Sequence, residues 1–264
     1  MSTKIQKTYL ELNDWKTEAF LILPSEELLD EVSSLPSVYL WAHGYTSHKG
    51  ALLNWAIRLA EEGRPSLVLD LPGHYLGSFN EVTDFDAFKQ NAHKMFVKAK
   101  ENLSSALDEK IDSETTTWVL GGHSLGGLLS LKALELQEFQ ELKTRSLAVG
   151  LGMPPKGKLH IFDTPFYKST LLVREQLVSP ALDSQSVFSW IKEEKNTLKL
   201  SNQKVSLICG EDDTVVGKEG ADLLKELLES QGNEVILEKP RKLPHHQPEL
   251  AAAHIKKHIK DLGL

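Results

Sequence analysis

The sequence predicts an α/β fold in which a mostly parallel sheet is covered by helices on both faces. Short apolar runs alternate with segments of helical periodicity along most of the chain, and strands that are apolar throughout are typical of sheets buried on both faces. At 264 residues, of which 41% are hydrophobic, the chain is long enough to bury a large core as a single domain, residues 1–264. In such sheets, binding sites form where strands end and loops lead into helices.

The first half of the chain predicts a hairpin followed by alternating strands and helices. Residues 6–12 and 17–23 alternate polar and apolar side chains, and Asn13 and Asp14 between them favour a tight turn. The next predicted elements are a strand over 38–42, a helix over 52–62 that ends at Gly63, a strand over 66–71 and a long helix over 84–110 with Asp84 as its N-cap.

The second half continues this alternation. The predicted elements are a strand over 116–120, a helix over 125–139, strands over 147–151 and 205–209, a helix over 217–230, a strand over 234–238 and a closing helix over 248–261. Residues 153–202 interrupt the order with several prolines and aromatic side chains. We interpret them as a lid or cap inserted between two strands, because long connections in compact domains are often functional. An ordinary surface connection is the alternative.

Composition and charge exclude several classes of partner. The net charge of −7 argues against nucleic acid or an anionic membrane surface, because both favour clustered Lys and Arg. No segment resembles a signal-peptide core or reaches the length of a membrane span, so the cytoplasm is the expected location. The single cysteine, Cys209, ends an apolar run, which predicts a buried, inert thiol and no intrachain disulfide. A monomer and a homodimer are both compatible with the sequence.

A serine in a glycine-rich turn is the strongest functional signal. Residues 122–126 read GHSLG and fit the pattern G-x-S-x-G, between a predicted strand and a predicted helix. A nucleophilic serine at such a turn has strained backbone geometry, and Gly122 and Gly126 are small enough for the close packing that it requires. The turn exposes the Ser124 hydroxyl above the sheet, at the N-terminus of the following helix. Ser124 is therefore the predicted nucleophile.

Candidate partners for this serine lie later in the chain. A serine hydroxyl needs a histidine to accept its proton, and the histidine needs a carboxylate to orient it. Glu211, Asp212 and Asp213 follow the predicted strand over 205–209, and His245 and His246 precede the closing helix. This is the order serine, acid, histidine that accompanies a serine turn of this type. The residues alone leave open which carboxylate and which histidine take part.

Several motifs in this order resemble the α/β-hydrolase family over nearly the full length of the chain. Besides the serine turn, they are HGYTS at 43–47, DLPGH at 70–74, GEDD at 210–213 and a histidine before the last helix. The chain is also similar to small bacterial carboxylesterases that carry an HGFTS-like segment. The resemblance implies the α/β-hydrolase fold and a serine nucleophile.

The resemblance also implies a role for individual residues. The family pattern selects Asp213 as the acid, and it favours His245 as the base, with His246 as the fallback. The segment before His245 departs from the commonest family form, in which a glycine precedes the histidine. By the same pattern, the backbone N–H groups of Tyr45 and Leu125 would form an oxyanion hole for the tetrahedral intermediate.

The other histidines are expected to be structural or exposed. His43 and His48 lie close in sequence but have no third ligand at a sensible spacing, so the sequence predicts no metal site and no cofactor. His74 is expected to hold loops beneath the site. His254 and His258, one helical turn apart in the closing helix, are expected to be exposed.

The predicted function is a serine hydrolase that cleaves a small or medium carboxylic ester through an acyl-enzyme. Alternatives with the same three residues are a thioesterase, another acyl or C–C bond hydrolase, and an acyltransferase, since substrate choice depends on loop shape. A non-catalytic ligand-binding protein with the same fold is an alternative of a different class.

Overall fold

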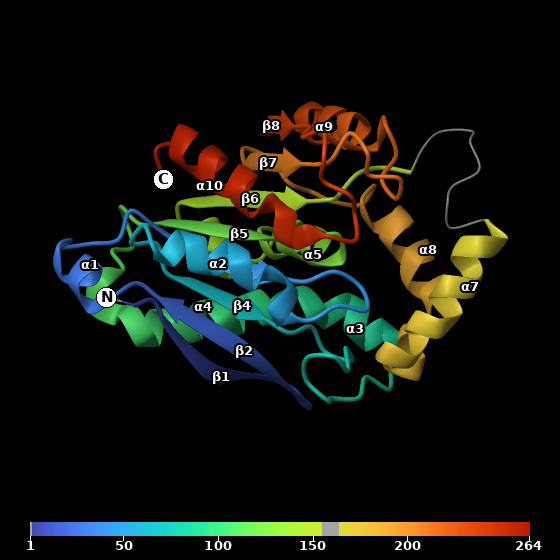
Figure 1. Ribbon diagram of the computed structural model, residues 1–264, viewed down its shortest axis with the longest axis horizontal. Coiled ribbons are helices and arrows are strands. Elements are labelled where there is room, and N and C mark those ends of the chain that lie inside the picture. Colours follow the sequence, from blue (N-terminus) through green and yellow to red (C-terminus); the bar gives the residue numbers. More distant parts are fainter. Residues whose placement is uncertain (1, 155–163) are drawn as a thin grey trace.

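The centre of the molecule is an eight-stranded sheet in the computed structural model, which describes residues 2–154 and 164–264 (Figure 1). The strand order is β1-β2-β4-β3-β5-β6-β7-β8. The pairs from β4 to β8 are parallel, and the pairs that involve β1 or β2 are antiparallel. The strands are β1 (Lys4–Leu12), β2 (Trp15–Leu23), β3 (Ser37–Ala42), β4 (Ser66–Leu69), β5 (Thr117–His123), β6 (Thr144–Val149), β7 (Lys204–Ile208) and β8 (Glu234–Glu238). The prediction of a mostly parallel sheet is confirmed.

The predicted opening hairpin is present, and its turn is where the sequence places it. Leu12 pairs with Trp15, so the turn consists of Asn13 and Asp14. Asn13 has a φ of 53°, a left-handed conformation that Asn tolerates better than most residues. Strand β2 then pairs with β4, and this pairing attaches the hairpin to the parallel part of the sheet.

Helices cover both faces of the sheet because the central strands present apolar side chains on both sides. Tyr39 and Trp41 of β3 pack with α2 (Leu53–Ala60) and α10 (Ala252–Asp261) on one face, which is turned toward the viewer in Figure 1. Leu40 of β3 belongs to the core on the other face. That face is covered by α3 (Phe85–Asn91), α4 (Met95–Leu107), α5 (Leu125–Ala133) and α9 (Gly220–Ser230). Short helices α1 (Glu26–Asp30) and α6 (Gln137–Gln140) complete this part of the fold.

The helix predicted over 84–110 is divided into α3 and α4. Asp84 is the N-cap as predicted, and its carboxylate accepts a hydrogen bond from the N–H of Asp86 at 2.8 Å. The break lies at Asn91, whose φ is −126° and whose side-chain amide donates to the carbonyl of Ala87. Asn disfavours helix interiors because its side chain competes for backbone groups in this way.

Two other helices are shorter than predicted. The helix predicted over 125–139 ends at Ala133, because the N–H groups of Glu135 and Leu136 bond to carbonyls three residues back and tighten the chain into a turn. The helix predicted over 217–230 begins only at Gly220. Gly217 before it has a φ of 75°, which a helix cannot accommodate.

The expectation that His258 is exposed is wrong. This side chain is 7% exposed, and its Nε2 lies 2.7 Å from the Ser206 hydroxyl of β7. It shares the inner face of α10 with Ile255 and Ile259, and burial lowers its pKa. His254, on the neighbouring face, is partly exposed and pairs with Glu238 at 2.8 Å.

The segment between β6 and β7 contributes two helices at the carboxyl end of the sheet. These are α7 (Pro165–Arg174) and α8 (Ser184–Glu194), which lie side by side at one end of the molecule in Figure 1. Trp190 of α8 contacts the rings of Phe85 and Phe88 edge-on, which attaches the segment to α3. The predicted lid at 153–202 includes residues 155–163, which lie outside the described part of the chain. Within that part, no helix is long and apolar enough to cross a membrane.

Trp55 tests the core between α2 and α10. Its ring is fully buried and its indole N–H donates to the carbonyl of Pro248 at 2.7 Å. Trp55→Ala should lower the free energy of unfolding by about 3–5 kcal/mol, because it leaves a cavity and an unpaired carbonyl. Urea denaturation measures this loss. Phe166→Ala, at a side chain that is 78% exposed, is the control, and equal effects of the two changes would contradict the core assignment.

Candidate active site

Ser124 lies in a strained turn between β5 and α5. Its φ is 51° and its ψ is −110°, which is an unfavourable conformation for a residue with a side chain. A Cβ atom on Gly122 would approach the carbonyl oxygen of Ala42 to 2.2 Å, and one on Gly126 would approach it to 2.0 Å. Both positions therefore require glycine, because β3 lies directly against the turn. The Ser124 N–H donates to the carbonyl of Val149 at 2.8 Å, which fixes the turn to β6.

The structure brings Ser124, His245 and Asp213 together in one hydrogen-bonded chain. His245 Nε2 lies 3.2 Å from Ser124 Oγ, and His245 Nδ1 lies 2.8 Å from Asp213 Oδ2. The ionised Asp213 carboxylate can only accept, so Nδ1 carries the proton and Nε2 is left to accept from the serine hydroxyl. The arrangement can remove a proton from Ser124 and stabilise the imidazolium that results.

Asp213 is held in place by the loop that follows β7. The residue is 3% exposed, and its Oδ1 accepts hydrogen bonds from the N–H groups of Val215 and Val216, each at 2.9 Å. These bonds leave Oδ2 for His245. Cys209, at the end of β7, is buried as predicted, and burial raises the pKa of its thiol to about 12.

The alternative acid and base residues have other surroundings. Asp212 is exposed, and its Oδ1 accepts from the N–H of Leu243 at 3.0 Å, while Glu211 points into solvent. The His246 ring stacks on that of Tyr167, with centroids 6.4 Å apart. Burial lowers the pKa of His246. Among the described residues, none of these side chains hydrogen-bonds to Ser124 or His245.

The two residues predicted for the oxyanion hole belong to different elements. Leu125 is the first residue of α5, and Tyr45 is in the loop after β3. The phenol of Tyr45 donates to the carbonyl of Leu182 at 2.7 Å, and its ring meets that of Phe188 edge-on. The Tyr45 side chain is therefore used to hold the segment between β6 and β7, and only its backbone remains for an oxyanion.

Two cavities meet at Ser124. The larger has a volume of about 240 Å³ and the smaller about 40 Å³, and both are lined by Ser124, His245, Phe188 and Val215. Helix α8 supplies part of the walls of both cavities, and α7 supplies part of the wall of the larger one. Among residues 2–154 and 164–264, no group of three or more His, Cys, Asp or Glu side chains is arranged to hold a metal ion.

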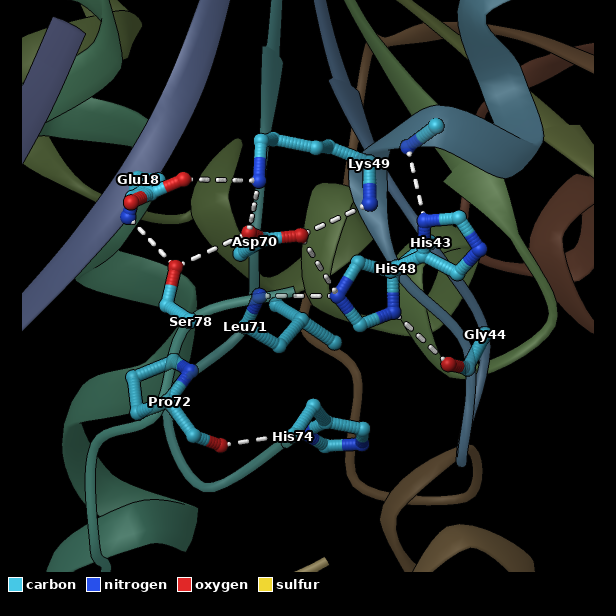
Figure 2. A network of polar contacts seen from close by, with 11 residues as sticks. Glu18, His43, Gly44, His48, Lys49, Asp70, Leu71, Pro72, His74 and Ser78 are labelled. Carbon is cyan, nitrogen blue, oxygen red and sulfur yellow. Dashed lines mark hydrogen bonds and ion pairs between the residues drawn. The ribbon is translucent and has the colours of Figure 1, made fainter. Parts of the chain in front are cut away.

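A buried ion pair, which the sequence analysis missed, anchors the loop after β3 (Figure 2). Lys49 Nζ lies 2.7 Å from Asp70 Oδ2, and the N–H of Lys49 donates to Asp70 Oδ1, also at 2.7 Å. Two further side chains complete the network. Glu18 Oε2 lies 3.2 Å from Lys49 Nζ, and the Ser78 hydroxyl donates to Asp70 Oδ2 at 2.8 Å. Lys49 lies just after HGYTS and Asp70 begins DLPGH, but nothing in the sequence pairs one motif with the other.

Two neutral histidines lie beside this pair. His43 Nε2 accepts from the N–H of Leu71 at 3.0 Å, and Nδ1 donates to the carbonyl of Gly44 at 2.8 Å (Figure 2). His74 Nδ1 donates to the carbonyl of Pro72 at 2.9 Å. Burial lowers the pKa of both imidazoles to about 3. They connect the loops after β3 and β4.

His48 caps the short turn after the HGYTS motif. Its Nδ1 accepts from the N–H of Gly50, and the side chain is partly buried rather than on the open surface.

Comparison with solved structures identifies the fold. A lipase in its open form superimposes with a TM-score of 0.64 and 15% sequence identity, over 98% of this chain and 97% of that chain. The Pyrococcus furiosus esterase Pf2001 gives a TM-score of 0.60 and 18% identity, and the match covers 98% of this chain and 90% of the esterase. The chain has the α/β-hydrolase fold.

The same fold forms one part of a larger relative. Pyrococcus horikoshii acylaminoacyl peptidase gives a TM-score of 0.64 at 12% identity, and the match covers all of this chain but 42% of the peptidase. No family sequence model matches the chain, and no curated protein does so by sequence. At these identities the likeness extends to the fold, and the chemistry has to be argued from the residues of the site.

The Lys49–Asp70 pair gives a test of the loop anchor. Lys49→Met should lower the free energy of unfolding by about 3–5 kcal/mol, because it leaves a buried carboxylate without its cation. Chemical denaturation measures the loss. Lys7→Met removes the exposed partner of Glu18 and should cost less than about 1 kcal/mol. If the two variants were equally stable, Lys49 would not be the anchor.

Protonation of the buried histidines gives a pH dependence. The pKa of His74 is about 3 in the folded protein and 6.5 in the unfolded chain, so the unfolded state binds the extra proton between these values and stability falls with pH below about 6.5. From pH 7 to pH 5 the loss is about 2 kcal/mol for this residue. Urea denaturation at both pH values measures this loss. Between pH 7 and pH 5, the free energy of unfolding of His74→Gln should fall by about 2 kcal/mol less than that of the wild type. Equal losses would mean that His74 is not held neutral.

Proposed function

We propose that the protein is a serine hydrolase that cleaves carboxylic esters through an acyl-enzyme. The single observation that carries the proposal is the hydrogen-bonded chain Ser124–His245–Asp213 on a strained turn at a helix N-terminus. This arrangement recurs where a serine is used as a nucleophile. The esterases and the lipase with the same fold are in keeping with it.

In the proposed reaction, Ser124 Oγ attacks the ester carbonyl while His245 Nε2 takes its proton. Asp213 holds the Nδ1–H of His245 and stabilises the positive charge on the ring. The backbone N–H groups of Leu125 and Tyr45 stabilise the oxyanion, and the positive end of the α5 dipole assists them. His245 then gives its proton to the leaving alcohol. In the second half-reaction it takes a proton from water, which attacks the acyl-enzyme and releases the acid.

The segment at 153–202 is proposed to act as a cap that shapes the substrate site. Its helices α7 and α8 supply Tyr167, Arg174 and Phe188 to the cavity walls, and none of the three proposed triad residues comes from it. The proposed substrate is a small or medium ester, in keeping with a cavity of about 240 Å³.

Labelling with a fluorophosphonate tests the nucleophile. The wild type should react at Ser124, as peptide mapping of the adduct would show, and hydrolysis of 4-nitrophenyl acetate should fall by at least about 1,000-fold in Ser124→Ala. Circular dichroism of the variant checks that it is folded. An adduct on another residue, or activity that survives in Ser124→Ala, would rule out the mechanism.

Neighbouring residues provide matched controls for the acid and the base. His245→Ala and Asp213→Asn should reduce kcat strongly, because each breaks the hydrogen-bonded chain. His246→Ala and Asp212→Asn change the same residue types one position away, and we expect much smaller effects. Initial rates on esters, thioesters and amides of the same acyl group then identify the bond that is cleaved. A larger loss for His246→Ala than for His245→Ala would reverse the assignment of the base.

A further inference from the structure

The two cavities at Ser124 have cationic side chains in their described lining. Arg174 lines the larger cavity, and Lys192 and Lys195 line the smaller one. Among the described residues, no Asp or Glu side chain lines either cavity. This distribution contrasts with the net charge of −7 for the whole chain. The charged side chains that line the two cavities are therefore all positive within the described residues, on a protein that is acidic as a whole.

Lys195 is a buried ammonium with no counter-ion among the residues that the structure describes. The residue is 5% exposed, and among the described residues its Nζ has one hydrogen-bond partner, the carbonyl of Gly152. An ammonium has three donors, so two have no partner in the described structure. Burial, together with the positive charge of Lys192, lowers the pKa of Lys195 to about 8. Burying a charge without an opposite charge costs free energy, which makes a structural role alone a poor explanation.

Arg174 is likewise without an acidic partner in the described part of the chain. It is the last residue of α7, it is half-buried, and its positive charge contributes to the lowered pKa of His246. Two acidic side chains of the same segment have other partners. Glu175 accepts from the N–H of Ser184 at 2.7 Å, and Glu194 pairs with Lys132 and accepts from the Trp190 indole.

We propose that Arg174 and Lys195 form an anion-recognising subsite around Ser124, and that the substrate is an ester that also carries a carboxylate or a phosphate-like group. The inference rests on the proposed function and specifies its substrate class. The larger cavity has room for the anionic group, and the planar guanidinium of Arg174 matches such a group with two parallel N–H donors. Lys195 supplies positive charge in the smaller cavity, which Ser124 also lines.

Three esters of matched length test this subsite. Monoethyl adipate carries a carboxylate, ethyl 5-phosphonopentanoate carries a phosphonate, and ethyl 6-oxoheptanoate replaces the charge by a neutral methyl ketone. Their hydrolysis is followed in a pH-stat at low salt, where charge effects are strongest. We expect kcat/KM of the wild type to be at least about tenfold higher for one of the anionic esters than for the neutral one, and the better of the two identifies the anionic group. Equal or higher kcat/KM for the neutral ester would overturn the inference.

Variants then locate the preference. Arg174→Gln should lower the ratio of kcat/KM for the anionic ester to kcat/KM for the neutral ester by about 10- to 100-fold, because the charge-assisted bonds are made only to the anionic one. Lys195→Met should lower the same ratio, and circular dichroism checks its fold. Lys168→Gln, an exposed lysine of α7 that lines an outer groove instead, should leave the ratio unchanged. Equal losses for charged and neutral esters in Arg174→Gln would show that Arg174 recognises no anion.

Binding to Ser124→Ala separates the subsite from the proposed chemistry. Calorimetry should show tighter binding of an anionic ester than of the neutral one, and Arg174→Gln in the same background should remove the difference. If this holds while Ser124 fails to react with a fluorophosphonate, the subsite stands and the proposed function fails. If Ser124 reacts and the neutral ester is hydrolysed as well as the anionic ones, the function stands and the subsite is rejected.

Discussion

The close approach of β3 to the serine turn is the constraint on which the site depends. The Ala42 carbonyl leaves no room for a side chain at Gly122 or Gly126, so the chain can pass from β5 to α5 only through the strained conformation of Ser124. Ala42 is also the last residue of β3, and the loop that carries Tyr45 begins directly after it. One packing contact therefore sets both the direction of the serine hydroxyl and the position of the loop beside it.

Charged groups in the supporting loops and charged groups along the cavities differ in their partners. In the loops after β3 and β4, Lys49 is paired with Asp70 and burial keeps His43 neutral, so these groups hold the loops rigidly. Along the cavities, Arg174 and Lys195 have no acidic partner in the described structure. Charges that pair with each other stabilise the loops, whereas charges without a partner are available to bind a ligand of opposite charge.

Sequence patterns predicted the fold and identified the residues that meet at the site as candidates, because both the strands and the serine turn leave local signals in the sequence. Apolar runs mark the strands, and the serine turn has a glycine spacing that follows from sterics. The break at Asn91 was missed because a side-chain hydrogen bond outweighed helical periodicity. The burial of His258 was missed although Ile255 and Ile259 mark the same face. The pairing of Lys49 with Asp70 and the placement of Lys195 depend on tertiary contacts, for which the sequence carries no periodic signal.

The segment between β6 and β7 touches the body at a few defined points. His74 pairs with Val178 in an isolated bridge, the N–H of Ser179 donates to the carbonyl of Gly73, and Tyr45 donates to Leu182. These contacts involve the backbone of the segment, whereas Trp190 of α8 packs through its side chain on α3. The exposed side chains of α7 are not part of these contacts, so they can change while the segment keeps its place over the sheet, and the lining of the cavity can vary on an unchanged support.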